Sequence, residues 1–159
     1  MLDLRDVPLD HPDAELLVRR ALAFYVELYG GEDGGDADPT PPEAFVPPAG
    51  RFLVGYLDGA PVASGGWRRP GIERLGTAAT AEIKRMYVAD QVRGLGLARV
   101  VLARLEETAR EAGIEAMVLS TGAPQVAAIG LYAAAGYTPI EPFGHYRDSP
   151  DVRCFGKRL

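Results

Sequence analysis

The stretch VADQVRGLGLARVVLARLEE, from Val88 to Glu107, decides the fold. Gly94 and Gly96 lie close together in it, an amphipathic helix pattern follows at once, and a strand-like run, AEIKRMYV, comes directly before it. A helix begins with about four backbone N–H groups that have no partner within the helix, and this end carries a partial positive charge. Glycines just before the helix remove the side chains that would keep an anion away from these groups. The stretch therefore predicts a strand, an anion-binding loop and a helix, in this order.

Two common phosphate-binding patterns do not fit this loop. A Rossmann fingerprint requires a third glycine, and Arg99 stands at that position. A Walker loop ends in Gly-Lys-Ser or Gly-Lys-Thr, and neither follows here. Because a Gly-x-Gly pair before a helix is also common as a tight turn, the residues alone leave two alternatives, an anion-binding loop of another kind and a turn without a ligand.

Length, charge and cysteine content limit the classes of protein to which the chain can belong. The 159 residues correspond to a single domain, 1–159, and no apolar run approaches the roughly 18 residues of a membrane span. The acidic N-terminus shows no secretion signal, so we expect a cytoplasmic protein that binds no membrane. The formal net charge of −5 argues against nucleic-acid binding. With Cys154 as the only cysteine and two histidines, we expect neither an internal disulfide nor a metal site.

The rest of the chain alternates between helix and strand patterns. An N-terminal helix is expected from Pro12, with His11 at its entry, to Gly30, and the Gly-, Pro- and Asp-rich segment 30–50 predicts a mobile loop. Further on we expect a hairpin over 52–57 and 61–67 and a strand over 80–88. A helix should run from 97 to the glycine at 113, with Glu106 on its exposed face. A strand over 115–121, a helix over 124–136, and strands over 137–143 and 151–159 should follow. This order indicates a mixed α/β protein, in which the strands on either side of the helix from 97 are parallel neighbours.

Two motifs of this chain resemble those of the GCN5-related N-acetyltransferase (GNAT) superfamily. The family's central motif is Arg or Gln, two residues, Gly, one residue, and Gly or Ala, and it is filled here by Arg93, Gly96 and Ala98. The downstream run AAIGLYAAAGYTPI is similar to the family's second helix motif, and the resemblance, to a common bacterial subgroup, covers 80–159 well. It implies a GNAT-like fold, with a central mixed β-sheet of about six to seven strands flanked by about four helices. It also implies an acetyl-CoA-dependent N-acetyltransferase without a metal.

The resemblance implies where acetyl-CoA binds. Its pyrophosphate is expected on the backbone amides from Gly94 to Arg99, which we call the glycine loop. Its pantetheine arm is expected beside the strand before that loop. Gln125 stands near the position where many relatives place an Asn that contacts the pantetheine. The implied acetyl-CoA-binding residues are Met86, Tyr87, Val88, Arg93, Gly94, Leu95, Gly96, Leu97, Ala98, Arg99 and Gln125.

Two residues are candidates for the chemistry of direct transfer to an amine. Glu82 lies where family members often carry a general base, acting directly or through a water; the alternative is a solvated strand residue paired with Lys84 or Arg85. Tyr132 matches the family's usual proton donor to the leaving sulfur; the alternative is a tyrosine that only packs in the core. Cys154 is expected to be a buried small hydrophobe rather than a nucleophile.

The acceptor is left open by the sequence. His145 and Tyr146 are expected either to reach a substrate from the loop between the last strands or to lie on the surface. Trp67 either lines an acceptor pocket or belongs to the core or its rim. The acceptor is expected to be a small-molecule amine or an exposed protein amine, and family analogy implies a homodimer. The alternative to an enzyme is a catalytically inactive acyl-CoA-binding regulatory or interaction module.

Overall fold

A seven-stranded mixed β-sheet forms the centre of the computed structural model, which describes residues 1–30 and 40–159. The strands follow the order β1-β2-β3-β4-β5-β7-β6, so the expected strand number and mixed α/β class are confirmed. The described residues form three α-helices and two short 3-10 helices, rather than about four helices. The strands are β1 (Asp3–Asp6), β2 (Gly50–Leu57), β3 (Ala60–Arg68), β4 (Thr80–Val88), β5 (Ala116–Gly122), β6 (Thr138–Pro139) and β7 (Val152–Arg158). The helices are α1 (Pro12–Tyr29), η1 (Pro42–Phe45), η2 (Asp90–Val92), α2 (Leu97–Glu111) and α3 (Val126–Ala134).

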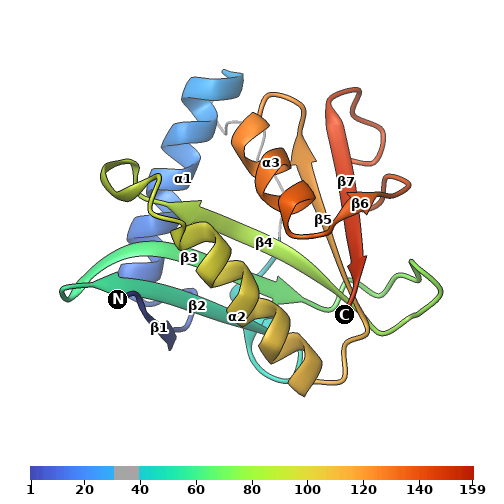
Figure 1. The fold of residues 1–159 in the computed structure, drawn as a ribbon, viewed down its shortest axis with the longest axis horizontal. Coiled ribbons are helices and arrows are strands. Elements are labelled where there is room, and N and C mark those ends of the chain that lie inside the picture. The colour runs from blue at the N-terminus through green and yellow to red at the C-terminus, as the bar shows by residue number, and fades with distance from the viewer. Residues whose placement is uncertain (31–39) are drawn as a thin grey trace.

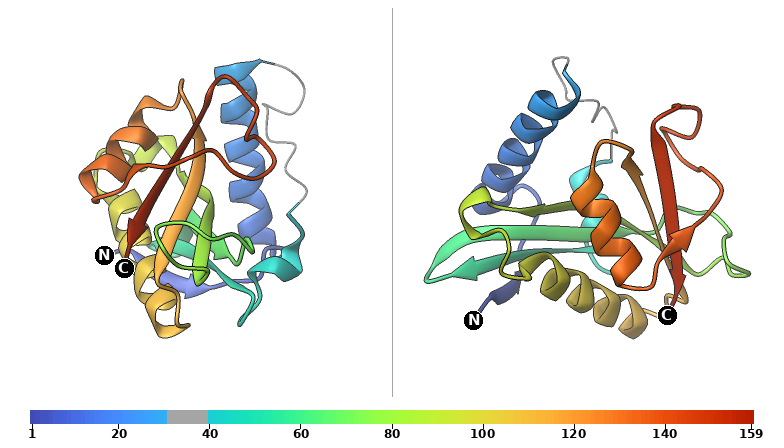
Figure 2. Two further views of the ribbon diagram at one scale, coloured as in Figure 1. Left: turned by 90° about the vertical axis from the view of Figure 1, so that its right-hand side faces the viewer. Right: turned by 45° about the horizontal axis from the view of Figure 1, so that its top comes forward.

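The sheet separates two layers of helices. Helix α1 covers one face, while α2 and α3 cover the other (Figure 2). Because side chains of a strand point alternately to its two faces, the strands supply both cores. Val54 packs with Leu17 of α1, and Trp67 packs with Leu105 of α2. None of the helices that the structure describes is long and apolar enough to cross a membrane.

Strands β4 and β5 are parallel neighbours, as expected, but they stay together over only three residue pairs. The pairs run from Thr80 with Ala116 to Glu82 with Val118. Beyond Glu82 the two strands diverge (Figure 1), while β4 continues beside β3 and β5 beside β7. The edge of β4 that follows Glu82 therefore has no strand partner on its β5 side within residues 1–30 and 40–159.

A β-bulge accompanies this divergence. The register between β3 and β4 shifts between Ser64 and Gly66. On β4, opposite the shift, Arg85 has a φ of 61°, in the left-handed region that non-glycine residues rarely adopt. The backbone oxygen of Arg85 accepts a hydrogen bond from Ser64 Oγ at 3.0 Å. The bulge therefore re-aims the side chains of β4 at the point where the strand leaves β5.

Three side chains lie as the sequence predicted. His11 caps α1, since its Nδ1 accepts a hydrogen bond from the backbone N–H of Asp13 at 3.0 Å. Trp67 is a core residue whose Nε1 donates to Thr108 Oγ1 at 2.9 Å. Cys154 is buried on β7.

The segment predicted as a loop at 30–50 falls partly outside the described residues, which omit 31–39. Within the described remainder, Pro42–Phe45 forms η1, and Phe45 is buried against Phe52 with their rings 5.8 Å apart. Gly50 already belongs to β2. The mobility of the segment stays a prediction.

Glu106 was expected on the exposed face of α2, and this expectation is wrong. Its side chain is buried, its Oε2 accepts a hydrogen bond from Tyr137 Oη at 2.7 Å, and Lys157 Nζ lies 3.1 Å from the same oxygen. Tyr137 directly precedes β6 and Lys157 lies on β7, and both side chains reach this part of α2 in three dimensions. A buried carboxylate is stable only with such partners.

Lys157→Met is expected to lower the free energy of unfolding by about 2–3 kcal/mol, because it leaves the buried carboxylate of Glu106 without its cation. Urea denaturation measures this change. Arg104→Gln is the control: its ion pair with Glu107 lies on the surface and contributes less than about 1 kcal/mol. Equal losses in the two variants would contradict the role of the buried pair.

Candidate active site

The glycine loop presents unpaired backbone donors to open space. Gly94 and Gly96 have φ angles of 84° and 76°, and a Cβ added at either would meet no atom within 4 Å. Gly96 caps α2 without any side-chain hydrogen bond, and the first turn of α2 holds no acidic residue. No group of the described residues accepts a hydrogen bond from the N–H groups of 94–99. This end of α2 therefore provides the donors, the field and the room that an anion requires.

The side chains around the loop have different roles. Leu95 and Arg99 are exposed at its rim, whereas Leu97 is buried in the core and Ala98 is half-buried. Together with the glycines, these residues place backbone rather than side-chain groups at the open side.

Arg93 holds the loop in place. Its Nε donates to the backbone oxygen of Val88 at 3.1 Å, and its Nη2 lies 3.0 Å from Asp90 Oδ1. Its guanidinium also stacks 5.0 Å from the ring centre of Phe24 on α1. The arginine of the central motif is thus engaged in joining the loop to the end of β4 and to α1.

The remaining residues expected to bind acetyl-CoA line the unpaired part of β4. Met86, Tyr87 and Val88 are half-buried, and Tyr87 and Val88 are paired to β3 on the other side of the strand. Met86 also lines a small cavity of about 90 Å³ between β4 and β5. The cavity reaches from this part of β4 to Tyr132 on α3.

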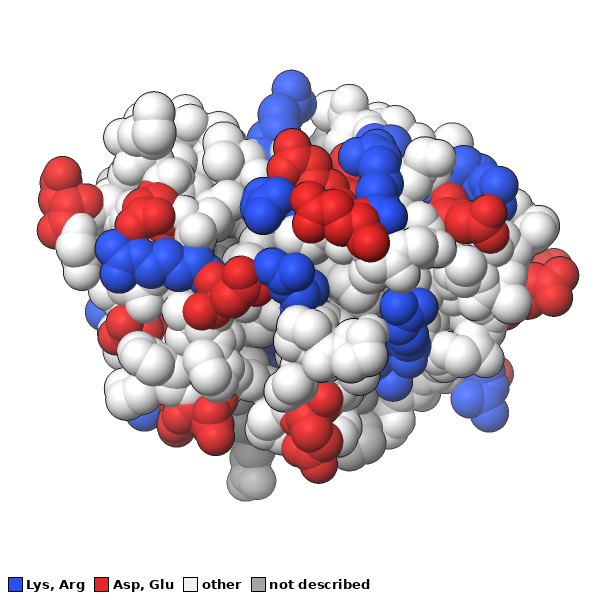
Figure 3. Space-filling model, turned by 90° about the horizontal axis from the view of Figure 1, so that it is seen from below, with Lys and Arg blue, Asp and Glu red and all other residues white. Residues whose placement is uncertain are grey.

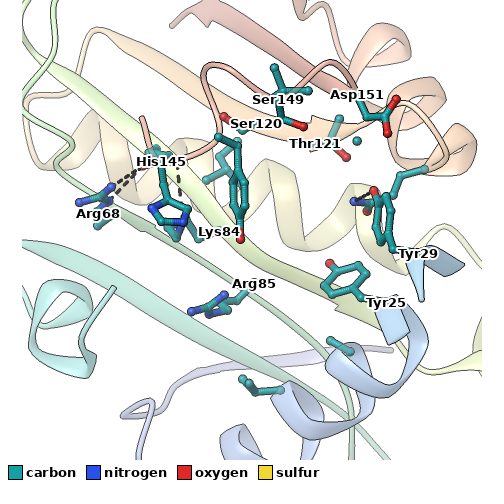
Figure 4. Close-up of a pocket in the computed structure, with 18 of the residues that line it drawn as sticks. Tyr25, Tyr29, Arg68, Lys84, Arg85, Ser120, Thr121, His145, Ser149 and Asp151 are labelled. Atoms are coloured by element: carbon teal, nitrogen blue, oxygen red, sulfur yellow. Dashed lines mark hydrogen bonds and ion pairs between the residues drawn. The ribbon is translucent and has the colours of Figure 1, made fainter. Parts of the chain in front are cut away.

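A larger cavity, of about 310 Å³, adjoins the small one. It lies between α1, the diverging strands and the segment before β7, and Tyr25, Lys84, Arg85 and Thr121 line both cavities. Figure 4 shows Arg68, Lys84 and His145 near one end of the larger cavity, and Tyr29 and Asp151 near the other. His145 and Tyr146 both line this cavity, and His145 is also exposed at the surface. Contact of either residue with a substrate stays a prediction.

Glu82 lines the larger cavity at the point where β4 and β5 separate, and it is buried rather than solvated. Its Oε1 accepts from Nε of Arg68 at 3.0 Å and lies 2.9 Å from Nη2 of the same guanidinium. Its Oε2 is 3.8 Å from Lys84 Nζ, which is an ion pair but too long for a hydrogen bond. One carboxylate oxygen is thus engaged by an arginine, while the other has no hydrogen bond from the described residues.

Tyr132 lies in the wall of the small cavity, with its ring packed edge-on to Tyr137 at 5.5 Å between ring centres. Burial, with a smaller contribution from Tyr25, raises the pKa of its phenol well above the usual value. The group therefore stays protonated through the neutral and mildly alkaline range. The side chain packs in the core, which was one of the two alternatives. It also borders a cavity, which a proton donor to the leaving sulfur would need to do.

Gln125 is directed at α1. Its Nε2 donates to Tyr29 Oη at 2.9 Å, and burial, opposed in part by this hydrogen bond, raises the pKa of Tyr29. Both residues line the larger cavity. The contact closes the end of the cavity where β5 leads into α3.

Sequence reasoning did not single out several residues that line the larger cavity. Arg68 looked like the polar end of an apolar strand, and Tyr25 like one more member of the apolar stripe of α1. Their roles depend on the packing of α1 over the bulge in β4, which no local pattern shows. The other residues in this group are Tyr29, Ser120, Ser149 and Asp151.

Comparisons with known proteins point to one family. The profile of the acetyltransferase (GNAT) family matches residues 17–137. An IAA acetyltransferase of Azospirillum brasilense is 36% identical over 147 residues, which cover 92% of this chain and 90% of that protein. A crystal structure from Klebsiella pneumoniae, described as an acyl-CoA N-acyltransferase, superposes with a TM-score of 0.80 at 27% identity and covers 100% of this chain and 98% of its own.

A further similar structure is an acetyltransferase from Salmonella typhimurium with acetyl-CoA. It superposes with a TM-score of 0.72 and covers 100% of this chain and 94% of its own. At 18% identity this likeness supports the fold alone. The family profile spans more than half of the chain, and the relative from Azospirillum exceeds 30% identity over most of it. The chain therefore belongs to the GNAT family of acetyltransferases. It is an N-acetyltransferase, as the two motifs predicted.

Proposed function

We propose that the chain transfers an acetyl group directly from acetyl-CoA to a primary amine bound in the larger cavity. The divergence of β4 and β5 carries this proposal, because it opens the two adjoining cavities and leaves the edge of β4 that leads to the open amides of 94–99 unpaired on this side. The amides fit a pyrophosphate, and the unpaired edge of β4 fits an extended chain with amide groups, which adds to a sheet edge as a further strand does. Acetyl-CoA, when bound, supplies the acetyl thioester.

Glu82 and Tyr132 divide the proton transfers. The acceptor nitrogen must lose a proton as its bond to the acyl carbon forms, and Glu82 Oε2 accepts this proton directly or through one water. The departing sulfur gains a proton as the carbon–sulfur bond breaks, and the Tyr132 hydroxyl, which stays protonated near neutral pH, donates it. Direct transfer is supported by the position of Cys154, the only thiol of the chain, which is buried and lines neither cavity.

The larger cavity favours a small-molecule acceptor. Its volume of about 310 Å³ lies at the lower end of the range for small-molecule sites. Lys84 and Arg85 line both cavities, and nearby positive charges favour the neutral form of an amine, which is the nucleophile. On the face shown in Figure 3, acidic and basic side chains are interspersed, so this face offers no continuous basic surface for a nucleic acid.

Calorimetric titration with acetyl-CoA, followed by an amine panel with thiol release as the readout, tests the proposal. We expect micromolar binding and amine-dependent release of CoA thiol. Binding without thiol release for any amine would favour the alternative, a catalytically inactive acyl-CoA-binding module. Absence of binding would contradict both.

A further inference from the structure

We propose that the amine acceptor also carries a carboxylate, and that Arg68 binds this carboxylate at the end of the larger cavity. This inference rests on the proposed function and names the class of acceptor. It begins with the way in which β3 and β4 hold the guanidinium. Arg68 is paired in register with Glu82 across these strands, so the two side chains leave the sheet side by side.

One edge of the guanidinium is fixed by a buried carboxylate. Nε and Nη2 of Arg68 both lie within 3.0 Å of Glu82 Oε1, and the Glu82 side chain is 7% exposed. The side chain of Arg68 itself is 29% exposed and borders the cavity. A guanidinium carries five N–H donors in one plane, and no group of the described residues accepts from its Nη1. The fixed edge thus leaves donors in a preorganised position for a second carboxylate.

The charges around the cavity support the same ligand. Arg68, Lys84 and Arg85 line the cavity, and Lys84 and Arg85 have contacts of their own, so Arg68 is the cation that carries this inference. Figure 4 shows Arg68, Lys84 and Arg85 on one side of the cavity and Asp151 on the other. A second ammonium group on the acceptor would be repelled from the cationic side, whereas a carboxylate would be attracted to it.

The two cavities also set the orientation of such an acceptor. Arg68 lines only the larger cavity, and Tyr132 only the smaller one, so the proposed carboxylate site and the proposed proton donor lie in different cavities. A carboxylate on Arg68 directs the amine of the same molecule toward the small cavity. Val18, Ala21 and Tyr25 of α1 lie along the larger cavity and offer apolar contact to the body of the molecule. The class is therefore a small aminocarboxylate rather than a polyamine.

Matched acceptors test the inference. One set is L-phenylalanine, L-phenylalaninamide and 2-phenylethylamine, which keep the body and the amine and differ in the carboxylate; a second set is L-alanine, L-alaninamide and ethylamine. At saturating acetyl-CoA, we expect the acid of at least one set to exceed its amide and its amine at least tenfold in kcat/KM. We expect Arg68→Gln to remove this preference mainly through KM, and Arg68→Lys to retain part of it. The preference is a ratio of kcat/KM values measured with two acceptors on the same variant. Any loss of rate that reaches the chemistry through Glu82 lowers both values equally and therefore cancels in this ratio.

Arg104→Gln, at an exposed arginine of α2, is the matched control and should keep the preference. Equal or faster reaction of the amines and amides in the wild type would overturn the inference and leave the proposed function intact. If no acceptor released thiol, the proposed function would fail, and titration with 3-phenylpropanoate and propanoate would decide the inference alone. Binding of either that is lost in Arg68→Gln would support it, and no binding to the wild type would overturn it.

Discussion

Gly96→Glu should weaken acetyl-CoA binding by at least about 100-fold, or about 2.8 kcal/mol, in a calorimetric titration. The substitution places a carboxylate and its side chain in the open space before α2, where the unpaired amides of 94–99 lie. The negative charge of the glutamate then lies at the positive end of α2, where we propose that the pyrophosphate binds. The left-handed φ of 76° adds a backbone cost of about 1–2 kcal/mol to the folded state.

Gly113→Glu separates the binding effect from this backbone cost. Gly113 follows the other end of α2, has a φ of 82°, and a Cβ added there also meets nothing within 4 Å. The Gly113→Glu variant should therefore lose a similar amount of stability in thermal unfolding but keep its affinity for acetyl-CoA. If both variants lost affinity equally, the loop before α2 would not be the anion site.

Tyr132→Phe should lower kcat by about 10²-fold, with little change in the affinity for acetyl-CoA. The substitution removes the proton donor that we propose for the departing sulfur and keeps the ring that packs on Tyr137. Steady-state kinetics with thiol release, together with calorimetry, measures both quantities. Tyr137→Phe is the control: it removes the hydrogen bond to Glu106 and should cost about 1–3 kcal/mol of stability, with a much smaller effect on kcat.

The pH dependence of the same pair of enzymes gives a second test. Burial raises the pKa of Tyr132 above its unfolded value, so the hydroxyl stays protonated up to about pH 10 and loses its proton only at higher pH. Between pH 7 and pH 10 the profiles of the wild type and of Tyr132→Phe should therefore be parallel. An alkaline decrease in this range that is present in the wild type and absent from the variant would show that the phenol titrates there.

Local patterns were sufficient for the centre of the fold. The glycines at 94 and 96 and the helix after them form one strand–loop–helix unit, and its chemistry depends only on adjacent residues. The same holds for His11 and Pro12 at the start of α1. By contrast, β1 has only four residues with no apolar alternation, and it forms because β2 offers an edge to pair with.

Partners distant in sequence were beyond local patterns. One alternative for Glu82 was pairing with Lys84 or Arg85, yet Arg68 is closer, because the register of β3 and β4 places it opposite. Glu106 shows the same limit, since its cation lies 51 residues away on β7. A helical pattern marks such a glutamate as polar but carries no information about what covers it.

Helix α1 touches both ends of the proposed reaction path. Phe24 stacks on Arg93 of the glycine loop, and five residues later Tyr29 binds Gln125 beside the larger cavity. A single helix thus contacts residues of both proposed substrate sites, and thermodynamic linkage makes any coupling between these sites reciprocal. Any factor by which bound CoA changes the affinity for the acceptor must equal the factor by which the acceptor changes the affinity for CoA. Phe24→Leu removes the stacking on Arg93 at a side chain that itself lines neither cavity, and it should reduce both factors together.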